Sequence, residues 1–241
     1  MAASGSAWIE VRKGLEAVQP GDPVYLYFLD TRGQMDPIRP LPRPDDPRTE
    51  FEPSSRQLIA GLDEVVKTSS GFRDVDAMDP ALRVNATFRG LTVLAFQAAA
   101  IPGRKNLLWV THGAPLFART QKGEMADFTP QFKEIGSRIA QSDVAIYAVD
   151  QSIAGAAADP NGQARAGLQM LTGITGGRWF PSSAFSQAMA ACSNDARSAY
   201  ELSYYSPLQD RKYHKVHLES PRKGVHLLTR EGYDGGSGPL P

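Results

Sequence analysis

Short apolar runs alternate with amphipathic stretches along most of this 241-residue chain. Three runs are almost wholly apolar, which predicts strands buried on both faces of a sheet: VYLYFL at 24–29, LLWVT at 107–111 and VAIYAVD at 144–150. RWFP at 178–181 predicts a further short strand. The proline-rich segment 30–53 is predicted to form at most an edge strand and then a loop, because each proline removes a backbone donor.

The stretches between these runs carry apolar residues at helical spacing. The clearest one opens at Asp79-Pro80, with proline in the first turn, and repeats apolar residues every three or four positions at Val84, Phe88, Leu91, Ala95 and Ala98. Residues 1–8 are small and polar and predict a frayed start. The same spacing predicts further helices at 9–18, 55–68, about 132–139, about 168–174 and about 182–195.

The order of these elements predicts the fold class. Strands and helices alternate over residues 9–195, which indicates an α/β protein with a Rossmann-like, doubly wound, mostly parallel sheet and helices on both faces. Three strand-like runs then follow, at 200–205, 213–219 and 225–230, separated by hairpin-sized turns. We therefore predict an α/β domain over 9–197, a small antiparallel β extension packed on it over 198–233, and a flexible tail over 234–241.

Charge and composition narrow the classes of partner. Lys and Arg number 26, as do Asp and Glu, so the net charge is zero. This balance argues against nucleic acid, because counterion release requires a cationic surface. No apolar run approaches 18 residues, so no membrane span is predicted, and the first residues lack the basic and apolar parts of a signal peptide. The single cysteine, Cys192, excludes an internal disulfide and is expected to be a buried structural thiol.

Two polar groups follow the run at 144–150, where ligands gather in open α/β sheets. The Asp150 carboxylate and the Ser152 hydroxyl are suited to a hard cation such as Mg²⁺, although Asp150 can equally cap a turn. The glycine-rich residues 175–178 follow a helix, and we interpret them as its C-cap instead of a phosphate loop.

Three histidines near the end of the chain do not predict a metal site. His214 and His217 are three residues apart on a predicted strand, so they point to opposite faces and do not converge on one ion, with or without His226. The PxxP spacing at Pro37 and Pro40 is attributed to a proline-rich loop, with a polyproline recognition element as the alternative.

Several blocks of sequence resemble one family. PGRKNLLWVTHGAP at 102–115 resembles the fourth-strand region of von Willebrand factor type A (VWA) domains, and more closely that of their bacterial VWFA-related subgroup. Further blocks resemble the family in the correct order, at 20–30, 144–150, 171–180, 200–207, 212–219 and 226–233. The resemblance implies a protein-binding module without enzymatic activity. It also implies an exported parent protein, periplasmic or secreted.

The chain departs from the family at the metal site. Metal-binding VWA domains use a D-x-S-x-S loop after the first strand, a threonine from a later loop and an aspartate after the fourth strand. This chain starts inside what resembles the first helix. After the fourth strand the family has a T-D-G motif, and at the matching place this chain has Thr111-His112-Gly113, so His112 replaces the aspartate. The segment 150–154, DQSIA, imitates the loop after the wrong strand, so Asp150 and Ser152 are interpreted as a decoy. The resemblance therefore implies no working site for Mg²⁺ or Mn²⁺ unless missing residues rebuild it.

The missing first strand is central in the VWA sheet, so its loss implies two strands with unpaired edges. We consider three explanations. The favoured one is that the chain is a fragment of a longer reading frame. In the second, residues 1–8 or another element repair the gap, and in the third the strands at 24–29 and 107–111 pair directly.

Three functional hypotheses remain at this point. The first is a non-enzymatic module that binds a protein through loops 30–53, 112–128 and 151–163, with Thr111, His112, Gly113, Asp150 and Ser152 as candidate contacts. The second is a hydrolytic or metal-assisted enzyme that uses Asp150, Ser152 and His112. The third is a truncated product without activity. A closed pocket joining the three polar residues would favour the enzyme, and an open surface would favour the module.

Overall fold

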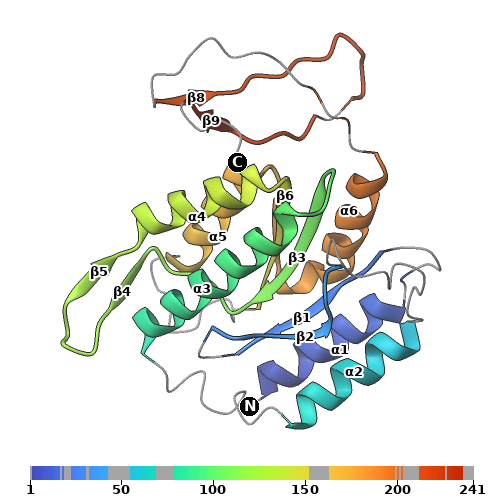
Figure 1. Ribbon diagram of the computed structural model, residues 1–241, viewed down its shortest axis with the longest axis vertical. Helices are drawn as coiled ribbons and strands as arrows, with labels where there is room; N and C mark the ends of the chain where they lie inside the picture. The colour runs from blue at the N-terminus through green and yellow to red at the C-terminus, as the bar shows by residue number, and fades with distance from the viewer. Residues whose placement is uncertain are drawn as a thin grey trace.

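The structure is a computed structural model, and it describes residues 2–16, 18, 23–30, 33–42, 55–68, 79–151, 163–198, 200, 202, 212–225 and 227–235. These residues form a mixed α/β arrangement (Figure 1). It contains a three-stranded parallel sheet, three two-stranded antiparallel sheets and six α-helices among the described residues. The coarse prediction of an α/β protein with a parallel sheet is confirmed.

The parallel sheet has the strand order β3-β6-β7 and comprises β3 (Lys105–Thr111), β6 (Val144–Asp150) and β7 (Arg178–Pro181). All seven residues of β6 are buried, because a strand flanks it on either side and helices cover both faces. This confirms the prediction for 144–150. All seven residues of β3 are half-buried, so the prediction of complete burial is wrong for 107–111: among the described residues β3 is an edge strand of its sheet.

Helices cover both faces of this sheet. On one face lie α3 (Pro80–Ala99), α4 (Thr129–Gln141) and α5 (Gln163–Thr175), whose apolar side chains share a core with Ile146 and Ala148 of β6. On the other face, α6 (Phe185–Arg197) follows the short 3-10 turn η2 (Ser182–Ala184) and packs against Val149. Alternate residues of β6 therefore face two separate cores, which explains its unbroken apolar sequence.

A separate hairpin is formed by β1 (Leu26–Leu29) and β2 (Met35–Arg39), which are antiparallel. The edge strand expected within 30–53 is confirmed as β2. All four residues of β1 are half-buried, so the prediction that 24–29 is buried on both faces is wrong. No ladder pairs β1 with β3, which also overturns the direct pairing of 24–29 with 107–111.

Two N-terminal helices pack against the β1–β2 hairpin: α1 (Ala2–Glu16) and α2 (Ser55–Thr68), which Figure 1 shows side by side below it. The Trp8 ring of α1 lies 6.4 Å from the Phe28 ring, and Leu15, Leu58 and Leu62 are buried beside them. The helix begins at Ala2 and not near residue 9, so the prediction of a frayed start is wrong. Residues 2–8 are helical, so they do not form the strand that the resemblance suggested as one way to repair the gap.

A hairpin that was not predicted lies within 112–128, which the sequence indicated only as a loop. It consists of β4 (Phe117–Arg119) and β5 (Met125–Asp127), joined by a turn in which Gly123 has a φ of 81°. Its strands have three residues each, which is too short for a period-two pattern to be recognised.

The C-terminal antiparallel segment is confirmed in outline, as β8 (Tyr213–Lys215) paired with β9 (Gly232–Asp234). The predicted strand at 225–230 is misplaced: its described residues are not in a strand, and the strand forms at β9 instead. The Glu231 amide donates to the Gly173 carbonyl of α5, which joins this segment to the parallel sheet's helical layer. The predicted strand at 200–205 and the tail beyond 235 fall mostly outside the described residues.

Candidate functional site

The carboxyl ends of β3 and β6 meet at one edge of the parallel sheet. Thr111 is in register with Asp150, and the Gln151 amide donates to the Thr111 carbonyl over 2.7 Å. We call residues Thr111, His112, Gly113, Asp150 and Gln151 the carboxyl edge. The structure thus brings together four of the five candidate contacts named from the sequence, while Ser152 lies outside the described residues.

The two titratable side chains of the carboxyl edge differ in their exposure to solvent. The Asp150 residue is 4% exposed, whereas His112 is exposed to solvent. The Thr111 hydroxyl donates to the Gly113 carbonyl over 3.4 Å, so its proton is engaged in a hydrogen bond within the same loop. A general base must lie within hydrogen-bond reach of the group it activates. The exposed His112 has access to a group in solution, and the buried Asp150 does not.

The loop that carries His112 is fixed by close backbone packing. Gly113 has a φ of 103°, in the left-handed region that favours glycine. At the next residue the chain passes so close to α5 that a Cβ atom on Gly167 would overlap the Ala114 carbonyl oxygen. The glycine at position 167 therefore allows the loop to rest on α5, and this contact positions His112.

One polar group at the carboxyl edge was missed by the sequence reasoning. Gln151 is 8% exposed, and its Nε2 atom is buried without a hydrogen-bond partner. Such groups are uncommon in folded proteins and call for an explanation. The available signal was a polar side chain directly after the buried run 144–150, but the neighbouring Asp150 and Ser152 led to the interpretation of a cation site.

The donor set does not fit a hard divalent cation. Mg²⁺ prefers about six oxygen ligands. The carboxyl edge offers one buried carboxylate, a threonine hydroxyl bonded to its own loop, and an imidazole. Across the described residues, no three His, Cys, Asp or Glu side chains gather closely enough to hold a metal ion.

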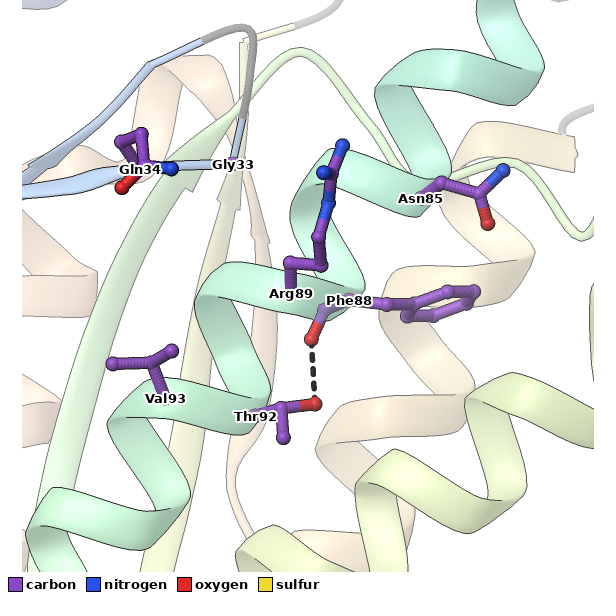
Figure 2. A pocket seen from close by; sticks show the side chains of 7 residues that line it. All are labelled: Gly33, Gln34, Asn85, Phe88, Arg89, Thr92 and Val93. Carbon is purple, nitrogen blue, oxygen red and sulfur yellow. Dashed lines mark hydrogen bonds between the residues drawn. The ribbon is translucent and has the colours of Figure 1, made fainter.

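A shallow pocket of about 600 Å³ lies between the β1–β2 turn and α3 (Figure 2). Its lining side chains diverge: Phe88 points to one side of α3 and Val93 to the other. The Thr92 hydroxyl donates to the Phe88 carbonyl over 2.7 Å, so its proton is engaged within α3. Arg89 is the one charged residue that lines this pocket. Small-molecule sites usually combine an enclosed shape with convergent polar groups, and this pocket has neither.

A partly buried polar cluster joins α6 to the parallel sheet. The Tyr147 hydroxyl donates to Asp195 Oδ2 over 2.7 Å, and Arg178 lies 3.2 Å from the same oxygen. Burial, and then the Asp195 carboxylate, raises the pKa of Tyr147 well above its usual range. A phenol that stays protonated serves here as a hydrogen-bond donor that anchors α6 to the sheet. The sequence separation of Tyr147 and Asp195 left no local signal for this pair.

Cys192 belongs to the same region and is half-buried. Burial, helped by Asp195, raises the pKa of its thiol from 9.0 to about 12. A thiol is nucleophilic as the thiolate, so Cys192 is an inert group and not a candidate nucleophile.

This pKa gives a prediction for alkylation. We expect iodoacetamide to label Cys192 slowly in the folded protein at mildly alkaline pH and rapidly in concentrated urea. Because the folded state keeps a proton that the unfolded state loses, the free energy of unfolding should fall as the pH rises from 9.0 towards about 12. Mass spectrometry of the labelled protein provides the measurement, and equal labelling rates in the two states would contradict it.

Two of the three C-terminal histidines lie in the part of the chain that the structure describes. The His214 ring lies 5.4 Å from the Tyr233 ring across the β8–β9 pair. His217 is exposed and contacts Glu219, with 2.8 Å between Nε2 and Oε1. His226 lies outside the described residues.

In the part of the chain that the structure describes, no helix has the length and apolar character needed to cross a membrane. Comparison of the chain with protein-family models, with curated proteins and with solved structures finds no match in any of the three.

Proposed function

We propose that this chain is a non-enzymatic, VWA-like module that binds a protein partner through its carboxyl edge, without a working metal-dependent adhesion site. The observation that carries the proposal is the arrangement of that edge. His112 is exposed between Thr111 and Gly113, while the only carboxylate in register with them, that of Asp150, is buried. An exposed imidazole on a rigid loop suits recognition better than catalysis.

The fold supports the choice of this edge. Ligands of open α/β sheets bind outside the carboxyl ends of the strands, and the carboxyl edge occupies that place for β3 and β6. The finer description of the fold, a Rossmann-like doubly wound sheet, is part of the proposal. Parallel strands with helices on both faces support it.

A protein partner fits this edge better than a small molecule. Protein interfaces form over open surfaces, with a few residues that carry most of the binding free energy. The pocket in Figure 2 has no convergent polar groups, and of the residues of the enzymatic alternative that the structure describes, Asp150 is buried and His112 is exposed. The module therefore has more support than a hydrolase that uses Asp150 and His112.

Thermal unfolding with and without millimolar Mg²⁺ or Mn²⁺ tests the absence of a metal site. Because a ligand that binds the folded state raises its stability by mass action, a working site would raise the Tm. We expect an unchanged Tm. An upward shift that is lost in Asp150→Ala would restore the metal-dependent alternative.

The binding surface is tested by affinity capture from extracts of the source organism, with quantification of each captured protein. We expect His112→Ala to weaken capture of the partner about tenfold, as the loss of an interface hot spot does. The matched control is Phe96→Ala on the exposed face of α3, where Phe96 is 83% exposed, and it should bind as the wild type does. Equal capture by His112→Ala and the wild type would contradict the proposed surface.

A further inference from the structure

The described residues of the C-terminal segment 212–235 stand at one end of the molecule, beyond the C-terminal end of α5 (Figure 1). The Glu231 amide holds the segment there by donating to the Gly173 carbonyl over 3.2 Å. The Ile146 amide donates to the Thr175 hydroxyl of the same helix, so this end of α5 lies beside the first half of β6. The segment is therefore attached near the amino ends of the parallel strands, away from the carboxyl edge.

Within this segment the chain runs outward from β8 and returns to β9. The Val216 amide donates to the Glu231 carbonyl over 2.9 Å, which closes the base of this excursion. The turn back is made near Gly224, whose φ is 77°, and among the described residues a Cβ atom at that position meets nothing within 4 Å. We call residues 216–231 the C-terminal arm, of which His226 lies outside the described residues.

Large apolar side chains are exposed along the C-terminal arm. Four of them have exposed fractions between 37% and 45%: Leu218, Val225, Leu227 and Leu228. Single exposed apolar residues are ordinary on protein surfaces, but four on one projecting arm form a cluster. Such clusters mark interaction surfaces, because the transfer of their apolar area out of water stabilises a complex.

The same part of the chain concentrates positive charge. Five of the 26 Lys and Arg lie within residues 212–230, against one of the 26 Asp and Glu. That one acidic residue is Glu219, whose Oε1 atom lies 2.8 Å from Nε2 of His217. Arg222 and Lys223 are exposed at the turn, between the apolar positions. The C-terminal arm is therefore positively charged, although the net charge of the chain is zero.

The composition of the C-terminal arm favours lipid over other anionic partners. The arm contains no Phe, Tyr, Trp or Met. Protein interfaces are enriched in aromatic residues and Met and depleted in Lys, and single-stranded nucleic acid is held by stacking on aromatic rings. Aliphatic side chains beside Lys and Arg instead complement an anionic bilayer, which presents negatively charged headgroups above an apolar boundary.

We propose that the C-terminal arm docks this chain on an anionic lipid surface. Arg222 and Lys223 lie among the headgroups, and the four apolar side chains of the arm enter the boundary between headgroups and acyl chains. Each Lys or Arg near such a surface strengthens binding about fivefold, and the apolar area adds to this. The proposal does not depend on the carboxyl edge, which lies at the other end of the parallel strands.

The test is co-sedimentation of the full chain with vesicles of phosphatidylcholine, either alone or mixed with phosphatidylserine in about a 2:1 ratio. We expect binding to the mixed vesicles only. It should weaken as the salt concentration rises from about 0.1 M to about 1 M, because the Debye length falls from about 10 Å to about 3 Å. The double variant Arg222→Glu with Lys223→Glu should bind the mixed vesicles at least about 25-fold more weakly.

Matched variants separate the contributions. Lys67→Glu with Lys122→Glu makes the same change in net charge at exposed positions on α2 and between β4 and β5, and it should bind as the wild type does. Leu227→Ser with Leu228→Ser keeps the charge and should weaken binding about tenfold, because less apolar area enters the lipid. His112→Ala should leave binding unchanged, which separates the arm from the carboxyl edge. A urea midpoint equal to that of the wild type shows that each variant is folded.

The proposal is overturned if the wild type does not sediment with the mixed vesicles at about 0.1 M salt. It is also overturned if the neutral vesicles bind equally well, if the lysine control loses as much binding as the arm variant, or if the leucine variant binds as the wild type does. An acidic protein or a nucleic acid is the occupant instead if a labelled poly-glutamate peptide or DNA oligonucleotide binds under conditions in which the mixed vesicles do not.

Discussion

Phe132→Ala is expected to cost about 3–5 kcal/mol of the free energy of unfolding. The Phe132 side chain is fully buried at the junction of α3, α4 and α5. Its ring meets the Phe88 ring edge-on at 4.8 Å, and the Phe128 ring lies 6.2 Å from the Phe88 ring. Truncation removes the transfer free energy of the ring and leaves a cavity among three helices that cannot close by moving one side chain.

Urea denaturation followed by circular dichroism measures this loss. Domains of this size have about 5–15 kcal/mol in total, so this loss is a large share of the stability and lowers the urea midpoint. The matched control is Phe96→Ala, which removes the same ring from a position that is 83% exposed on α3. Its cost should stay within about 0.5 kcal/mol. A cost for Phe132→Ala below that of the control would show that the three-helix core is not formed in solution.

Gly167→Ala is the second substitution with a large expected effect. Alanine normally stabilises a helix by about 1 kcal/mol relative to glycine. At this position the added methyl group overlaps the backbone carbonyl of Ala114, which cannot rotate away as a side chain does. Separation of α5 from the loop costs about 1–3 kcal/mol as overpacking, so the net effect is destabilising. The movement also displaces His112 from the carboxyl edge.

Gly173→Ala on the same helix provides the control. Its added methyl group meets the carboxylate of Glu231, which is exposed and free to move. We therefore expect Gly173→Ala to be neutral or stabilising, while Gly167→Ala lowers the urea midpoint and shifts the His112 resonance in proton NMR. If Gly167→Ala is as stable as Gly173→Ala, the loop does not rest on α5 in solution.

The position of the candidate site was predictable because it depends on strand order. A buried parallel strand ends where its apolar run ends, so Asp150 and Thr111 could be assigned to one edge of the sheet from their sequence alone. The depth of each side chain was not predictable. Asp150 is buried and His112 is exposed because of the helices and the loop that pack around them, and no local pattern encodes that difference.

The amino-acid sequence by itself determined the local elements of this protein. The helices at 55–68 and after Asp79, and the strands at 144–150 and 178–181, form where the spacing predicted them, because propensity, capping and periodicity act over a few residues. The tertiary structure alone decided which edges are paired. The run at 107–111 is as apolar as that at 144–150, yet it is half-buried, since pairing depends on which strand the fold brings beside it.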